Sequence, residues 1–403
     1  MTPPSLHLAV AFDGTGAHPA SWREPGARPA ALFTPAYWID LARTAERGLL
    51  DLLTIDDSFG LQSSHERVLD GRTDQVRGRL DAVMIASLVA PSTTRIGLVP
   101  TLVTTHTEPF HLASAISTLD WVSEGRAGWR PAVSSSQSEA EHVGRRQFPR
   151  LDPSRRDDPV ASAFERDLFE EAADVTHVMR RLWDSWEDDA VIRDLATGRF
   201  VDRDKLHYVD FEGRFFSVKG PSIVPRPPQG NPLVVAVAQS QVPFEFAARS
   251  ADVVVVAPAD AADVALRIDD VRQAEASMSR PGEPLRILAD LVVFLDDTSS
   301  AAAARRNRLD ELDGASFRSD AAVFVGTPGD LADELSVWRA SGLDGFRLRP
   351  GVLSHDLDRI VDGVVPVLQQ RGAFRTEYDD GLLRERFGLA RLPSRYASAT
   401  EAP

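Results

Sequence analysis

Short apolar runs rich in β-branched residues alternate along the chain with longer amphipathic segments. This alternation is typical of a parallel sheet in which each strand is followed by a helix. It predicts eight strands, at residues 6–12, 51–56, 95–100, 126–133, 232–238, 252–257, 285–295 and 344–349. It predicts helices at residues 35–47, 81–90, 111–123, 167–186, 243–250, 261–279, 299–312, 331–341 and 357–370.

Eight strand–helix repeats without a central glycine-rich fingerprint favour a closed (β/α)8 barrel, an α/β TIM barrel, over a doubly wound sheet. We expect one domain over residues 1–403, with an insertion at about 134–165 after the fourth strand. A second insertion is expected before the fifth strand, at about 187–228. A polar C-terminal arm is predicted from about residue 372.

Composition narrows the classes of function. The chain has 45 Lys and Arg against 60 Asp and Glu, a formal charge of −15, so nucleic-acid binding is not expected. It has no cysteine, which excludes disulfides and thiolate chemistry, so redox chemistry would need a cofactor. No apolar run approaches the roughly 20 residues that cross a bilayer, and the N-terminus lacks a signal-peptide pattern, which predicts a cytoplasmic protein.

In a (β/α)8 barrel the reacting groups lie where strands end at their carboxyl edge. The residues that follow the predicted strands two to five are mostly hydroxyl-bearing: Asp56, Asp57, Ser58, Thr101, Thr104, Thr105, His106, Trp129, Ser134, Gln239 and Ser240. Such a set suits an organic cofactor or substrate better than a metal ion, and we expect no metal site. Taken singly, each residue has an equally ordinary structural interpretation, as a cap, a turn or a strand edge.

Two histidines could act as a general base near neutral pH. His106 falls directly after the third strand, and His111 follows on the next helix. Ser240 precedes a helix that begins near Pro243, where a serine either holds a phosphate or serves as a plain helix cap.

Several motifs of other enzyme classes are missing. The segment Gly14-Thr-Gly-Ala-His-Pro lacks the third glycine of a dinucleotide loop, and no Walker loop is present. His65-Glu66 lacks the second histidine of a zinc protease, and there is no Gly-x-Ser-x-Gly elbow. These absences argue against nucleotide hydrolases, zinc proteases and α/β-hydrolases.

Four longer motifs stand in the first half of the chain: Asp40-Leu-Ala-Arg-Thr-Ala-Glu-Arg-Gly-Leu-Leu-Asp, Glu108-Pro-Phe-His-Leu-Ala, Ser117-Thr-Leu-Asp-Trp-Val-Ser-Glu-Gly-Arg-Ala-Gly-Trp and Leu182-Trp-Asp-Ser-Trp-Glu-Asp-Asp-Ala. Through these motifs the chain resembles the luciferase-like flavin-dependent monooxygenases, in particular the branch of nitrilotriacetate, EDTA and dibenzothiophene-sulfone monooxygenases. The resemblance extends from the first strand to about Val256, and it fades afterwards.

The resemblance implies a barrel that receives reduced FMN (FMNH2) from a separate NAD(P)H:flavin reductase and reacts it with molecular oxygen. The resulting C4a-(hydro)peroxyflavin would oxygenate a small organic substrate. By position, Asp56, Thr101 and Thr104 would lie near the flavin ring, and Ser240 would contact its phosphate. His106 or His111 would handle protons. Relatives of this kind suggest a homodimer or homotetramer.

Three departures from the family pattern concern cofactor binding. Arg130 follows Gly128-Trp129 where the family has asparagine, and the phosphate loop Ala238-Gln-Ser-Gln-Val-Pro243 keeps only its serine. Glu165 and Phe169 stand where the family has histidine and tyrosine, and arginines of the first insertion could compensate: Arg145, Arg146, Arg155 and Arg156. Two alternatives therefore stay open, an oxidoreductase using deazaflavin F420 and a catalytically silent paralogue acting as a partner subunit.

Overall fold

Eight parallel strands close into a barrel in the computed structural model, which describes residues 6–63, 70–149, 158–280 and 282–397. In order around the barrel they are β1 (His7–Phe12), β2 (Leu52–Ile55), β3 (Gly97–Val103), β4 (Gly128–Ala132), β9 (Leu233–Val237), β10 (Val253–Val256), β11 (Arg286–Leu295) and β13 (Gly345–Pro350). The barrel closes because β13 pairs with β1, from Gly345 beside His7 to Leu348 beside Val10. The predicted (β/α)8 fold is confirmed.

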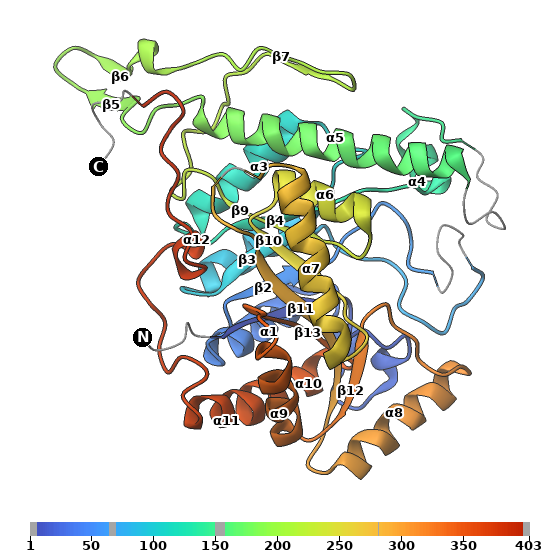
Figure 1. Cartoon of the computed structure of the whole chain (residues 1–403). Coiled ribbons are helices and arrows are strands. Elements are labelled where there is room, and N and C mark those ends of the chain that lie inside the picture. The colour runs from blue at the N-terminus through green and yellow to red at the C-terminus, as the bar shows by residue number, and fades with distance from the viewer. Residues whose placement is uncertain (1–5, 64–69, 150–157, 281, 398–403) are drawn as a thin grey trace.

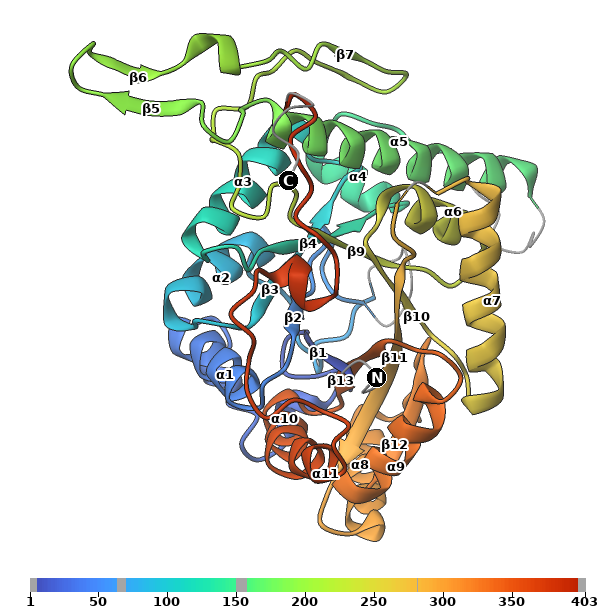
Figure 2. The same ribbon diagram turned by 60° about the vertical axis from the view of Figure 1, so that its left-hand side comes forward.

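Helices surround the strands, as Figures 1 and 2 show. They are α1 (Pro35–Arg47), α2 (Ala82–Val89), α3 (Pro109–Val122), α5 (Pro159–Asp184), α6 (Gln241–Ser250), α7 (Ala261–Ser277), α8 (Ser299–Asp313), α9 (Pro328–Arg339), α10 (Leu353–Arg359) and α11 (Val365–Gln370). α1 buries Trp38, Leu41 and Ala45 on one face, as its 3.6-residue period predicts. Within the described residues, every helix is too short or too polar to cross a membrane.

The sheet that forms the barrel has a ninth strand, β12 (Ala322–Gly326), which was not among the strands predicted from the sequence. It pairs with the second half of β11, from Leu291 to Leu295, whereas the first half of β11 pairs with β10. Because β11 is ten residues long and β10 only four, the upper edge of β11 would otherwise stay unpaired. β12 covers that edge.

The two insertions carry structure of their own. The first contains α4 (Gln137–Val143) and the first turns of α5, which begins eight residues before the predicted helix start. Asp158 caps α5 by accepting a hydrogen bond from the Val160 N–H, and Pro159 occupies the first helical position. The second insertion forms two hairpins, β5 (Val191–Asp194) with β6 (Arg199–Val201) and β7 (Phe211–Glu212) with β8 (Ser217–Val218), which lie beyond α5 in Figure 1.

The C-terminal arm is not the polar segment that its sequence predicted. Its short helix α12 (Leu383–Arg386) lies over the amino-terminal end of the barrel, drawn in red at the centre of Figure 2. Leu383 and Phe387 are at most 1% exposed and pack against apolar side chains of the barrel interior. A Cβ on Gly97 would lie 2.6 Å from Leu383 Cδ1, so only glycine leaves room for this leucine. The arm therefore plugs the barrel.

Candidate active site

The interior of the barrel changes from apolar to charged along its axis. Strand residues that point inward alternate with residues that face the helices. Near the amino-terminal end the inward side chains are aliphatic: Ala9, Leu52, Val99, Leu233, Val235, Val253, Val255 and Leu288. The same alternation continued toward the carboxyl ends places charged and hydroxyl groups inside: Asp13, Asp56, Thr101, Arg130, Asp290, Arg347 and Arg349.

Arg130 joins two of these groups. It lies beside Thr101 in the β3–β4 register, and its Nε donates a hydrogen bond to Thr101 Oγ1 at 2.7 Å. The other end of the guanidinium pairs with Asp56, which also lies 3.4 Å from Arg79 Nη1. Burial alone would raise the pKa of Asp56, but Arg130 and Arg79 hold that pKa below its ordinary value. Asp56 is thus a fixed anion.

A second ion pair spans β11 and β13. Asp290 and Arg347 are partners in the strand register, and Nε and Nη2 of Arg347 each lie 2.6 Å from a carboxylate oxygen of Asp290. Arg349, two residues on, lies 2.6 Å from Asp320, which also accepts a hydrogen bond from Gln239 at 2.9 Å. Burial opposes ionisation of Asp320, but Arg349 lowers the pKa of this carboxyl to about 2. The charges in this part of the barrel are therefore paired.

Asp13 stands apart from these pairs. It follows β1 directly and is level with Asp56, because Phe12 is paired with Ile55 in the β1–β2 register. Its side chain is exposed to the cavity, and within the described part of the chain its carboxylate has no hydrogen-bond partner. Although the cavity keeps the carboxyl accessible, the surrounding barrel mouth displaces much of its solvent, and this desolvation together with the neighbouring Asp56 carboxylate raises the pKa of Asp13 to about 6.

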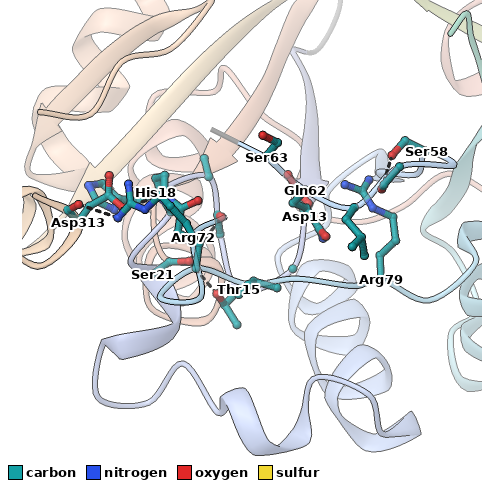
Figure 3. A pocket seen from close by; sticks show the side chains of 18 of the residues that line it. Asp13, Thr15, His18, Ser21, Ser58, Gln62, Ser63, Arg72, Arg79 and Asp313 are labelled. Carbon is teal, nitrogen blue, oxygen red and sulfur yellow. Dashed lines mark hydrogen bonds and ion pairs between the residues drawn. The ribbon is translucent and has the colours of Figure 1, made fainter. Parts of the chain in front are cut away.

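A cavity of about 1,030 Å³ opens above these strand ends. Its walls come from the loops after β1 and β2, from α4 and from the segment before β12. Figure 3 shows Asp13 between Arg79 on one side and the group of His18, Arg72 and Asp313 on the other. The lining also includes Ser21, Ser58, Gln62, Glu139, His142 and Phe317. A concave site of this size, at the carboxyl end of a barrel, is the usual place for an organic ligand.

The family model described as luciferase-like monooxygenase matches residues 14–345. The chain belongs to the luciferase-like monooxygenase family. The match extends well beyond Val256, where the resemblance was expected to fade.

Relatives of this luciferase-like chain cover nearly its whole length. N-acetyl-S-(2-succino)cysteine monooxygenase of Bacillus subtilis (strain 168) is 32% identical, covering 97% of this chain and 98% of that protein. Nitrilotriacetate monooxygenase component A of Aminobacter aminovorans is 31% identical, covering 96% of this chain and 97% of the relative. The crystal structure of long-chain alkane monooxygenase superposes with a TM-score of 0.85 at 24% identity, covering 96% of each chain, which supports the fold.

Within this luciferase-like barrel, two of the four predicted flavin-contacting residues lie together. Asp56 and Thr101 are joined through Arg130. Thr104 is buried, and its hydroxyl donates to the Ala132 carbonyl at 3.0 Å, a contact that ties the ends of β3 and β4 together. Ser240 is exposed at the start of α6, is not among the residues that line the large cavity, and its side chain makes no capping hydrogen bond.

The two histidines proposed for proton handling differ in their surroundings. His111 is exposed on the first turn of α3. His106 lines a smaller cavity of about 90 Å³ with Thr104, and its ring lies 5.7 Å from Phe59 and 5.9 Å from Phe148. Its Nε2 is buried without a hydrogen-bond partner in the described residues, and burial lowers its pKa. His106 is therefore a neutral imidazole with one nitrogen free.

The arginines that could replace a lost phosphate ligand are engaged elsewhere. Arg145 forms an ion pair with Glu108. Arg146 forms a bidentate ion pair with Glu171, in which Nη1 and Nη2 each donate to one carboxylate oxygen. Arg155 and Arg156 lie outside the described residues. Of the two substituted positions, Glu165 is exposed, while Phe169 packs against Phe246 of α6 at 5.6 Å between ring centroids.

Asp13 and Arg79 line the cavity but were not among the predicted site residues. Asp13 follows the first strand as Asp56 follows the second, so the strand-end rule, applied also to the first strand, would have found it. Arg79 lies in a loop more than twenty residues after β2, where no periodic signal marks its position. Only folding of that loop over the barrel mouth brings it to Asp56.

Proposed function

We propose that this chain is the oxygenase component of a two-component monooxygenase that uses reduced FMN and molecular oxygen to oxygenate a small organic substrate. The observation that carries the proposal is the large cavity at the carboxyl ends of β1 and β2 in a luciferase-like barrel. The name of the relative, nitrilotriacetate monooxygenase component A, supports a division of labour with a separate NAD(P)H:flavin reductase.

The residues around the cavity fit a flavin. Its volume of about 1,030 Å³ lies at the upper end of the range for small-molecule sites and accommodates a tricyclic ring with a substrate beside it. At the floor, Arg79 Nε is buried without a partner in the described chain, so a donor is available to a ring oxygen. The Ser240 hydroxyl and the first N–H groups of α6 are donors for a phosphate. A bound reduced flavin would supply the electrons that activate oxygen.

The chain's own residues would position the ligand and restrict water. The ion pairs of Arg130 with Asp56 and of Arg347 with Asp290 hold oriented charges at the carboxyl ends of the strands, next to Asp13 and Arg79, which line the cavity. The loop over residues 13–21 and the segment 313–318 form the outer walls. Neutral His106, set among aromatic rings, would accept a proton at its free Nε2.

The decisive experiment is an anaerobic titration of the purified chain with reduced FMN, followed by oxygen uptake with a panel of thioether and polycarboxylate substrates. The panel would include N-acetyl-S-(2-succino)cysteine and nitrilotriacetate, and a separate flavin reductase would supply reduced FMN. We expect binding and substrate-dependent incorporation of 18O from 18O2 into a product. A chain that does not bind reduced FMN would exclude the proposal.

A second candidate is a partner subunit without oxygenase activity. The observation in its favour is that Arg130 already engages both Asp56 and Thr101, two positions expected to face the flavin ring. In that case the chain alone would not incorporate 18O, and activity would appear only on mixing with an active oxygenase subunit.

We also propose that the chain forms a homodimer or homotetramer. Large apolar side chains are exposed on neighbouring helices, with Met84 on α2 at 65% exposure and Trp121 on α3 at 49%. Exposed side chains of this size are common at subunit interfaces. Light scattering coupled to size-exclusion chromatography would measure the assembly, and a monomer of 44.1 kDa would contradict the proposal.

A further inference from the structure

Three carboxylates line the cavity, those of Asp13, Glu139 and Asp313. Asp313 accepts hydrogen bonds from Arg72 and from Gln75. Glu139 belongs to α4 and lies on the outer wall, away from the strand ends in the chain. Asp56, at the strand end next to Asp13, is held by Arg130 and Arg79.

Asp13 is the cavity carboxylate at the strand ends, level with the ionised Asp56, and its side chain has no hydrogen-bond partner among the described residues. The charged groups around it come from four elements of the barrel: Asp56 after β2, Arg79 from the following loop, Arg130 of β4 and Arg349 of β13. All three arginines are turned toward other carboxylates as well, namely Asp56 and Asp320. An anion at Asp13 therefore gains only part of their attraction and is opposed by Asp56.

The remaining cavity histidines offer different chemistry. His18 accepts a hydrogen bond at Nδ1 from the Ala20 N–H and lies 3.0 Å from Asp310 through Nε2, so both ring nitrogens are occupied. His142 is exposed on α4, on another wall of the cavity. His142 is thus the cavity imidazole that competes with Asp13 for proton exchange with a bound ligand.

We propose that Asp13 is the proton donor of the large cavity, giving its carboxyl proton to a basic oxygen of a ligand bound against the ends of β1 and β2. This inference rests on the proposed function and assigns one of its steps. The carboxyl O–H bond breaks as a new O–H bond forms on the ligand, and the Asp13 carboxylate regains its proton from solvent water through the open cavity. No other reactant is needed.

The loop after Asp13 packs closely against the backbone that follows β13. A Cβ on Gly16 would lie 2.4 Å from the Gly351 carbonyl oxygen and 2.7 Å from the Leu353 N, so this residue must be glycine. Its backbone also has φ +138°, a conformation that other residues rarely adopt. The chain that follows Asp13 is thereby held against the end of β13, and the Asp13 side chain is left facing the cavity.

Asp13→Asn tests the proposal, with His142→Gln as the matched variant on another wall. Dissociation constants for oxidised FMN would be measured by flavin fluorescence between pH 5 and 8. Because the phosphate of FMN itself titrates near pH 6, each variant is compared with the unaltered chain at the same pH, where that contribution cancels. We expect the unaltered chain to lose affinity severalfold relative to Asp13→Asn as pH rises through 6, and His142→Gln to behave like the unaltered chain.

Thermal unfolding of the ligand-free proteins gives a readout independent of flavin. A carboxyl whose pKa is raised on folding stabilises the protein below its unfolded pKa, and this contribution is lost as pH rises through the folded value. The melting temperature of Asp13→Asn should therefore rise relative to the unaltered chain between about pH 4 and pH 6, and the difference should stay constant at higher pH.

The outcomes separate the two hypotheses. FMN binding with an affinity ratio that does not change with pH, or with a step that disappears in His142→Gln instead, overturns the assignment of Asp13 and leaves the proposed function standing. Absence of FMN binding at every pH overturns the proposed function and this inference with it. Binding with the expected step, together with the expected change in melting temperature, supports both.

Discussion

Arg130 and Thr101 face each other across the β3–β4 ladder, with the arginine Nε 2.7 Å from the threonine hydroxyl. The same guanidinium neutralises Asp56, so one side chain organises three positions at the barrel mouth. Arg130 stands where the family has asparagine, and it binds the two residues that are expected to contact the flavin ring. The contribution of its ion pair to the free energy of unfolding can be measured.

We expect Arg130→Met and Asp56→Asn each to destabilise the fold, and the double variant to cost less than the sum of the two. Removal of one partner leaves a partly buried charge uncompensated, whereas removal of both does not. Since Asp56 is 37% exposed and Arg79 stays beside it, the coupling should be about 1–2 kcal/mol, below the values for fully buried pairs. Urea denaturation of the four proteins at pH 7 would measure it, and additive losses would show that the pair is not coupled.

The plug at the base of the barrel should contribute strongly to stability. Phe387→Ala removes a fully buried ring from the contact with the barrel interior and should cost about 3–5 kcal/mol. Leu392→Ala, on the same arm but 39% exposed, serves as the control and should change the free energy of unfolding by less than about 0.5 kcal/mol. Equal effects in chemical denaturation would mean that the arm does not pack as described.

Asp51 should make stability depend on acid pH. Its carboxylate is fully buried, lies 2.9 Å from His7 Nδ1, accepts a hydrogen bond from the Leu8 N–H and pairs with Arg375 of the C-terminal arm. Burial alone would raise its pKa, but His7 and Arg375 hold that pKa below the ordinary value. The resulting stability is present above the unfolded pKa of about 3.9 and is lost as pH falls through the lower folded value.

Asp51→Asn should therefore cost about 3 kcal/mol at pH 7, because it leaves the largely buried Arg375 guanidinium without its carboxylate partner. The difference from the unaltered chain should shrink in strongly acidic solution, where Asp51 of the unaltered chain is itself protonated. Denaturant unfolding at pH 7, 5 and 3 would follow this convergence. A difference that stays constant over the whole range would contradict the role of the carboxylate charge.

Ser240 should act on the phosphate of FMN and not on its ring. We expect Ser240→Ala to weaken FMN binding roughly tenfold, the effect of one hydrogen bond to a charged group. Riboflavin, which lacks the phosphate, is the matched ligand, and its affinity should not change. A loss of equal size for both ligands would place Ser240 at the ring or assign it a structural role instead.

The sequence by itself determined the architecture. Alternating apolar runs and amphipathic segments gave the eight barrel strands and their helices, since burial against one continuous core imposes those periods locally. The polar insertions and the altered position of Arg130 were also visible. Local patterns did not predict β12, because this segment is a strand only where it pairs with the free edge of β11. They also did not predict the packing of the C-terminal arm, because its few apolar residues are buried only against the open end of the barrel.

The arrangement of the site was decided by tertiary structure. Asp13, Asp56, Arg79 and Arg130 are far apart in the chain, and their pairing depends on strand register and on the path of a long loop, neither of which leaves a periodic signal in the residues themselves. The same holds for protonation. The sequence shows two aspartates after two strands, but only the fold places Arg130 and Arg79 against Asp56, which makes it a fixed anion. The same fold leaves Asp13 beside it, where desolvation and the Asp56 carboxylate raise the pKa of Asp13 to about 6.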